Sequence, residues 1–151
     1  MVVISDLVDR DKLNDIHPRN KLPVGRRPAQ MALARTYEMK NGVDSGPTFA
    51  SMSISGSSAR ISFRDTDSGL ATRDGKAPDW FTIAAADGKF EPAEARIEGN
   101  NVFVSSPKIA TPIAVRFAWD ECAQPNLMNK EGLPASPFRT DKFPGLKEKN
   151  K

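Results

Sequence analysis

The stretch Arg60-Ile61-Ser62-Phe63-Arg64 decides the fold of this chain, because apolar and polar side chains alternate along it. A period of two places the apolar residues on one face of a β-strand and the polar residues on the other. Similar short runs recur after residue 46 between turn sequences such as Asp87-Gly88, which predicts an antiparallel β-sandwich or a curved sheet. The predicted strands are 49–53, 60–64, 80–84, 93–98, 102–105 and 113–119. Trp80 and Trp119 lie in two of these strands, so we expect them in the core rather than stacked on sugars.

Residues 1–45 show a different pattern, which makes the chain a mixed α and β protein. Val2-Val3-Ile4 has the composition of the end of a buried strand, and the apolar spacing over 23–39 predicts a helix. Pro28 removes a backbone donor, so either this helix begins near Pro28 or it is kinked there. Because a strand end and one helix leave an apolar face uncovered, we expect residues 1–45 to pack poorly on the β-rich part or the chain to self-associate.

The domain boundaries follow from these patterns. Residues 1–45 form the first unit, 46–146 form a β-rich domain with an ordered C-terminal loop, and 147–151 form a charged tail.

Composition excludes several classes of function. One cysteine, Cys122, and one histidine, His17, permit neither an internal disulfide nor a zinc cluster, and the sequence contains no cofactor-binding motif. No apolar run approaches the ~18 residues of a membrane-spanning helix. Part of the net charge of +3 lies in the tail 147–151, and the other basic residues alternate with acids, unlike the clustered charge of a nucleic-acid reader. We therefore expect no metal, no cofactor, no membrane and no nucleic acid.

His17 is the candidate catalytic residue that the sequence offers. It lies in a loop between the apparent strand end and the predicted helix, with Asp15 two residues before it. A histidine beside a carboxylate is the base-and-orienter half of a nucleophilic triad, although a surface pair without chemistry has the same sequence. No serine lies in a Gly-x-Ser-x-Gly motif, and Cys122 has no second histidine to activate it, so we find no nucleophile.

Three segments carry a resemblance to a known family. The first reads Asn14-Asp15-Ile16-His17-Pro18-Arg19-Asn20-Lys21 and continues through Val24-Gly25-Arg26-Arg27 to Tyr37. The second reads Pro125-Asn126-Leu127-Met128-Asn129, followed by Glu131-Gly132-Leu133-Pro134-Ala135-Ser136-Pro137-Phe138-Arg139-Thr140-Asp141. Together with 113–119, they resemble the C-terminal part of the sialate O-acetylesterases, serine esterases of the SGNH (GDSL-like) hydrolase group. The resemblance covers about residues 2–145.

The resemblance implies that the two parts of the chain belong to different domains. The first forty residues would close an SGNH-type α/β hydrolase domain, with the rest as attached β-structure. His17 falls on the family's general base, and Asp15 is the expected orienting acid. Many SGNH enzymes place that acid three residues before the histidine, where this chain has Asn14, so Asp6 or a dyad without an acid stays open. The family's serine and oxyanion hole lie far upstream of its histidine, so we expect this chain to be a fragment.

The expected function is therefore the C-terminal part of a carbohydrate O-acetylesterase. Its partners would be an O-acetylated sugar, either sialic acid or another acetylated glycan, and the missing N-terminal hydrolase segment. The family resemblance implies a secreted or periplasmic parent enzyme. The alternative is a β-sandwich that serves as a non-catalytic binding or structural module.

Overall fold

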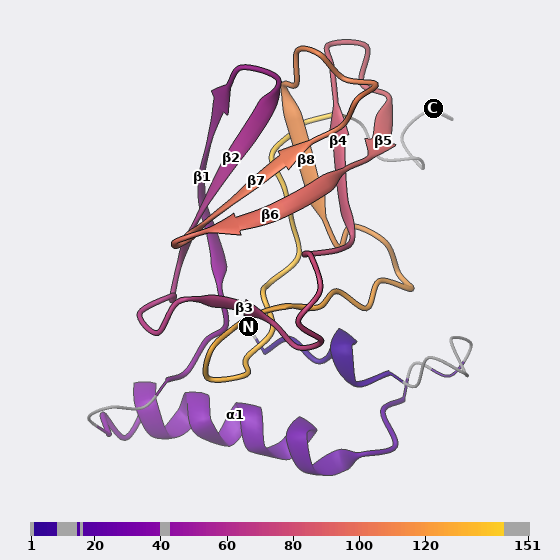
Figure 1. Ribbon diagram of the computed structural model, residues 1–151. Coiled ribbons are helices and arrows are strands. Elements are labelled where there is room, and N and C mark those ends of the chain that lie inside the picture. The colour runs from indigo at the N-terminus through magenta and orange to yellow at the C-terminus, as the bar shows by residue number, and fades with distance from the viewer. Residues whose placement is uncertain (1, 9–14, 16, 40–42, 144–151) are drawn as a thin grey trace.

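The computed structural model describes residues 2–8, 15, 17–39 and 43–143, and it contains a β-sandwich flanked by one long helix (Figure 1). The elements in chain order are the 3-10 helix η1 (Ser5–Leu7), the helix α1 (Lys21–Arg35) and the strands β1 (Thr48–Ser55), β2 (Ser58–Arg64), β3 (Leu70–Thr72), β4 (Phe81–Ala84), β5 (Phe90–Pro92), β6 (Glu94–Glu98), β7 (Asn101–Ser105), β8 (Ala114–Phe117), β9 (Leu127–Asn129) and β10 (Phe138–Arg139). Among the described residues, no helix has both the length and the apolar composition needed to cross a membrane.

The strands form two four-stranded antiparallel sheets, which confirms the antiparallel arrangement expected from the alternation. One sheet has the order β1-β2-β7-β6 and the other has the order β10-β8-β4-β5. A two-stranded ladder of β3 and β9 lies apart from both. β1 and β2 are joined by the tight turn at Gly56, whose φ of 60° suits a residue without a Cβ.

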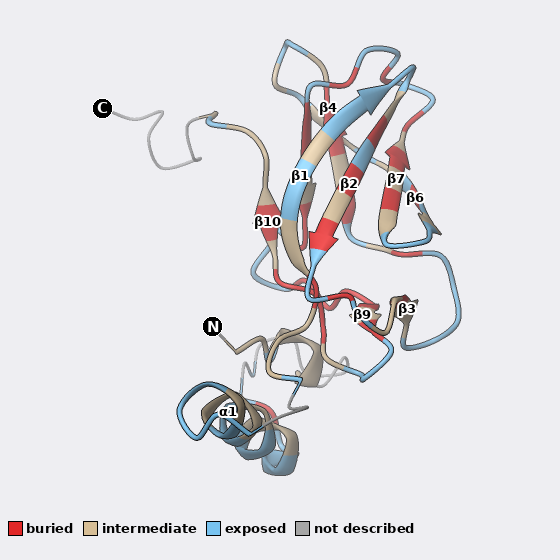
Figure 2. Ribbon diagram, turned by 90° about the vertical axis from the view of Figure 1, so that its left-hand side faces the viewer, coloured by how far each residue is buried: buried red, intermediate tan, exposed pale blue. Residues whose placement is uncertain are grey.

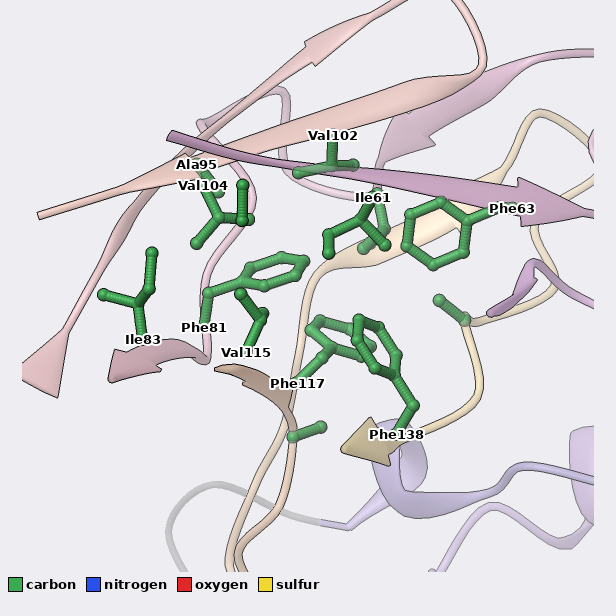
Figure 3. Packing of buried hydrophobic residues seen from close by; sticks show 14 of the residues in the cluster. Ile61, Phe63, Phe81, Ile83, Ala95, Val102, Val104, Val115, Phe117 and Phe138 are labelled. Atoms are coloured by element: carbon green, nitrogen blue, oxygen red, sulfur yellow. The ribbon is translucent and has the colours of Figure 1, made fainter. Parts of the chain in front are cut away.

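The core lies between the two sheets (Figure 3). Ala59, Ile61 and Phe63 of β2 are buried, whereas Arg60 and Arg64 are exposed, as the alternation predicts. A cluster of phenylalanine rings joins the sheets. Phe138 of β10 stands at its centre, with ring centroids 4.7 Å from Phe49, 5.7 Å from Phe117, 5.9 Å from Phe63 and 6.4 Å from Phe81.

Trp80 and Trp119 are not core residues, so that expectation was wrong. Their exposed fractions are 42% and 53%. β4 begins only at Phe81 and β8 ends at Phe117, because Trp80 (φ 60°) and Ala118 (φ 49°) adopt the left-handed backbone conformation and end the alternation. This conformation costs a non-glycine residue about 1–2 kcal/mol.

The N-terminal region also differs from expectation. Residues 2–4 form no strand, and Ile4 is exposed, because no described strand lies beside them to complete a ladder. The helix α1 begins at Lys21 after the N-cap Asn20, whose side chain accepts a 3.2 Å hydrogen bond from the Leu22 amide, and it continues through Pro28. It contains no buried residue (Figure 2), which agrees with the expected poor packing for the helix alone. Asp6 and Val8 before it do hydrogen-bond to Arg73 and Gln124 of the β-rich part.

The linker between α1 and β1 packs closely against the segment that follows β9. Asn129 donates a hydrogen bond to the Ser45 carbonyl (3.1 Å), and the Ser136 amide donates to the Pro47 carbonyl (2.9 Å). A Cβ on Gly46 would lie 2.0 Å from the carbonyl oxygen of Pro134, so only glycine fits there without backbone movement. The linker is thus held by backbone contacts.

Candidate active site around His17

The structure brings the predicted pair Asp15 and His17 together. Asp15 Oδ1 lies 3.2 Å from His17 Nδ1 and accepts the backbone N–H of His17 at 3.1 Å. The backbone hydrogen bond, followed by the bond from the imidazole, lowers the pKa of Asp15 below its usual value. The carboxylate is therefore ionised at neutral pH and can hold the imidazole with its proton on Nδ1. Nε2 then carries the free lone pair of the imidazole, and the His17 side chain is 80% exposed.

Asp6, the alternative orienting acid, has other partners. Its two carboxylate oxygens accept hydrogen bonds of 2.7 and 2.8 Å from Arg27 on α1. Arg73 approaches the same carboxylate at 3.9 Å. The structure therefore places Asp6 in an ion-pair network and does not bring it to His17; Asn14, the other position considered, lies outside the described residues.

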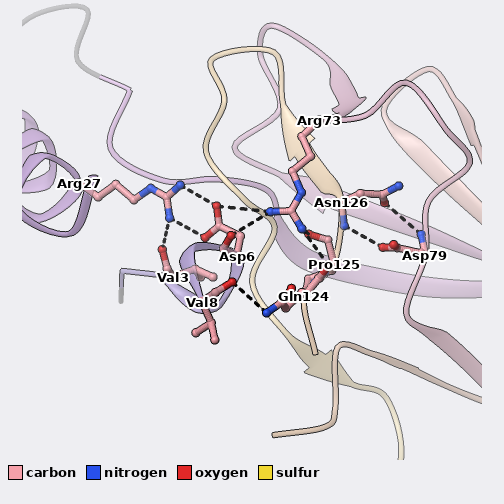
Figure 4. A network of polar contacts seen from close by, with 9 residues as sticks. All are labelled: Val3, Asp6, Val8, Arg27, Arg73, Asp79, Gln124, Pro125 and Asn126. Carbon is pink, nitrogen blue, oxygen red and sulfur yellow. Dashed lines mark hydrogen bonds and ion pairs between the residues drawn. The ribbon is translucent and has the colours of Figure 1, made fainter. Parts of the chain in front are cut away.

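The contact between Arg27 and Asp6 ties α1 to the N-terminal segment. Both side chains are only 12% exposed, so this pair is shielded from water far more than an ordinary surface pair. Arg27 also donates a 2.8 Å hydrogen bond to the Val3 carbonyl (Figure 4). Asp6 precedes the segment that carries His17 and Arg27 follows it, so the pair joins the two flanks of that segment.

A second set of contacts ties the N-terminal segment to the sandwich. Arg73 donates to the backbone carbonyl of Asp6 (3.1 Å) and to those of Gln124 and Pro125 (2.8 Å each). Gln124 in turn donates a 3.0 Å hydrogen bond to the Val8 carbonyl (Figure 4). Both flanks of the His17 segment are therefore anchored, directly or through Arg27, to loops of the β-domain.

Asn126 fixes the loops from which these contacts come. Its buried side chain donates to Asp74 Oδ1 (3.0 Å) and to the Ala77 carbonyl (2.9 Å), and its oxygen accepts the Asp79 amide (3.1 Å). Sequence reasoning did not assign roles to Arg27, Arg73 or Asn126. Arg27 and Asn126 belong to the segments that resemble the esterase family, whereas Arg73 does not. The partners of all three are distant in sequence, so no local motif reveals these contacts.

The nucleophile is the part of the site that these residues do not supply. Within the described part of the chain, the His17 side chain contacts Asp15 and hydrogen-bonds to no serine hydroxyl. The pair can accept, hold and return a proton, but acyl transfer needs a positioned nucleophile as well.

Comparison with solved structures finds a similarity to a carbohydrate esterase. The crystal structure of a carbohydrate acetylesterase from Xanthomonas citri matches this one with a TM-score of 0.87 and 42% sequence identity. The match covers 94% of this chain and 32% of that protein, so the chain spans about a third of its relative's length. No protein-family profile and no curated protein matches the chain.

Proposed function

We propose that this chain is the C-terminal part of a carbohydrate O-acetylesterase of the sialate O-acetylesterase type, with His17 as its general base. The nucleophile is a serine outside these 151 residues. The observation that carries the proposal is the 42% identity to a carbohydrate acetylesterase over 94% of the chain. That relative is about three times as long, which leaves room for a segment that supplies the serine.

The reaction assigns each proton to a stated atom. The serine oxygen attacks the acetyl carbonyl carbon while Nε2 of His17 takes the hydroxyl proton. The tetrahedral intermediate then expels the sugar oxygen, which receives that proton from His17 and leaves as a hydroxyl. Water attacks the acetyl-serine, His17 takes one proton of the water, and acetic acid leaves as that proton returns to the serine oxygen. The acid then ionises, so an acetylated sugar and water yield a sugar, acetate and a proton.

Asp15 acts through His17. Its carboxylate is bound to Nδ1, so it keeps the lone pair of the imidazole on Nε2 and stabilises the imidazolium that forms in each half-reaction. Because the same carboxylate oxygen accepts the backbone amide of His17, the acid and the base are held by one local turn.

The test is a chimera in which this chain replaces the equivalent segment of the Xanthomonas citri enzyme. We expect the chimera to release acetate from an acetylated oligosaccharide, and His17→Ala to lower kcat by about a thousandfold or more. Asp15→Asn should also lower kcat. Asp87→Asn is its matched control, because Asp87 accepts a backbone amide two residues onward (3.2 Å, from Lys89) in an exposed loop of the sandwich.

Three results would overturn the proposal. A folded chimera that is inactive would contradict the esterase assignment, and a chimera that keeps its activity in His17→Ala would remove His17 from the mechanism. The isolated chain provides the second arm: acetate release above the buffer rate would show that a nucleophile lies within these 151 residues.

A further inference from the structure

The two tryptophans of the chain lie just outside two neighbouring strands, at the same end of one sheet. Trp80 immediately precedes β4, and Trp119 follows β8 by two residues. Phe81 pairs with Phe117 in the ladder, and the Ala118 amide donates a 2.9 Å hydrogen bond to the Trp80 carbonyl. Both indoles are exposed, which is an uncommon arrangement for the two largest side chains of a small domain.

The backbone keeps these rings out of the core. Trp80 and Ala118 face each other across the ladder, and both adopt the left-handed conformation. Bulky residues rarely adopt positive φ, and such residues concentrate at binding and catalytic sites. Glycine at position 80 would relieve the strain, so the presence of tryptophan there favours a role for the ring itself.

Charged residues lie next to Trp119. The guanidinium carbon of Arg139 lies 5.6 Å from the centroid of the Trp119 ring, and Asp120 and Glu121 are exposed directly after Trp119. A sugar ring has an apolar C–H face that packs on an indole and hydroxyl groups that hydrogen-bond to such a rim. A folded protein domain would have to bury these charges, at a cost. The chemistry therefore fits a saccharide better than a protein partner.

The tryptophans lie beside the region that anchors the His17 segment. Asp79, the neighbour of Trp80, accepts the Asn126 amide at 2.8 Å (Figure 4). The loop after Trp119 leads to Gln124, which bonds to Val8 just before the segment that carries His17. A ligand on the tryptophans would therefore lie at the end of the sandwich to which the candidate catalytic segment is attached.

We propose that Trp80, Trp119 and Arg139 form a saccharide-binding site on the β-sandwich. The two indoles stack on successive sugar rings, and Arg139 donates hydrogen bonds to hydroxyl or carboxylate oxygens. This proposal rests on the proposed function, because a glycan held here would be the chain whose acetyl groups the enzyme removes.

Intrinsic fluorescence tests the site directly, because Trp80 and Trp119 are the only tryptophans in the sequence. We would titrate the isolated chain with the neutral cellohexaose and xylohexaose and with the acidic sialyllactose. A saturable change with any of them supports the site. Arg139→Gln separates the two chemistries, because it should weaken binding of the acidic probe more than binding of a neutral one.

Calorimetric titration of variants separates binding from folding. We expect Trp119→Ala to weaken binding about tenfold, which corresponds to about 1.4 kcal/mol. Trp80→Gly should weaken it similarly while the protein stays folded, because glycine accepts the positive φ of this position. Tyr37→Ala, which removes an exposed aromatic ring outside the sandwich, is the control and should bind normally.

Three results would overturn the site: no saturable response to any probe, binding that persists in both tryptophan variants, or fluorescence that changes only with protein concentration. The failure of this proposal is distinguishable from that of the esterase proposal. Binding to the isolated chain requires no nucleophile, whereas the His17→Ala chimera reports on acetate release alone.

Discussion

Replacement of Asp6 by asparagine tests whether polar contacts hold the candidate catalytic segment to the sandwich. Asp6→Asn keeps the size of the side chain but removes the charge that faces Arg27. Breaking a fully buried pair by removing one partner costs about 3–5 kcal/mol, whereas an exposed pair is worth about 0.2–1 kcal/mol. Both side chains are 12% exposed and the amide oxygen can still accept one hydrogen bond, so we expect a loss of about 2–3 kcal/mol.

The loss should be local, because α1 has no buried residue and the core of the sandwich lies elsewhere. Hydrogen–deuterium exchange followed by mass spectrometry can separate the two regions. Exchange in α1 should accelerate about 30- to 150-fold, which is the same 2–3 kcal/mol expressed as an opening equilibrium. Exchange in β2 should not change. Glu98→Gln, which removes an exposed ion pair with Arg96, should alter neither region.

Unchanged exchange in α1 of the Asp6→Asn variant would refute this reasoning, because it would mean that something other than the Arg27 contact holds the helix. Equal acceleration of exchange in α1 and β2 would refute the expected local loss, since it would show that the two regions unfold as one unit.

Two further changes address the sandwich and its linker, both measured by urea unfolding. Gly46→Ala should lower the free energy of unfolding by about 3 kcal/mol, because the new methyl group would overlap the Pro134 carbonyl and displace a linker held by hydrogen bonds to its backbone. Gly25→Ala, in an open stretch of α1, should instead raise it by about 0.5–1 kcal/mol. Equal effects of the two substitutions would contradict the packing argument. Asp141 accepts two 2.9 Å hydrogen bonds from Arg116, which lower the pKa of Asp141 below its usual value. The stability that Asp141 contributes is therefore fully present above its pKa in the unfolded chain, near 4. This stability is lost as the pH falls through the lower pKa of the folded protein. Asp141→Asn should therefore cost about 2 kcal/mol at pH 7 and progressively less below about pH 4, and a cost independent of pH would contradict it.

The sheets were predictable where the strands are long enough to show alternation. β2 and β7 bury every second residue over five or more positions, so the pattern is visible in the sequence. β3, β5, β9 and β10 are two or three residues long and were not predicted. A run of that length cannot display a period of two, and these strands exist because tertiary contacts bring their partners alongside.

The candidate site was predictable only in its local part. Asp15 and His17 are two residues apart, so a single turn brings them together. The contacts that anchor them are not local: Arg27 lies 21 residues from Asp6, and Gln124 lies 116 residues from Val8. The positions of Trp80 and Trp119 were missed because left-handed backbone at a non-glycine residue has no sequence pattern.

The exposure of His17 and the exposure of α1 have one explanation under the proposed function. The contact between the 80% exposed His17 side chain and Asp15 lies in the high dielectric of water, where charge interactions are weak, and a surface that covered both groups would strengthen it. The helix that follows His17 presents Leu22 and Leu33 to solvent, and Tyr37 just after the helix is exposed as well, although burial of apolar side chains is what ordinarily stabilises a helix in a protein. A hydrolase segment that brought a serine to Nε2 would cover both at once. The sandwich would then hold the segment that carries His17 through Asp6 and Arg73, while the hydrolase segment that supplies the serine covers the exposed side of His17.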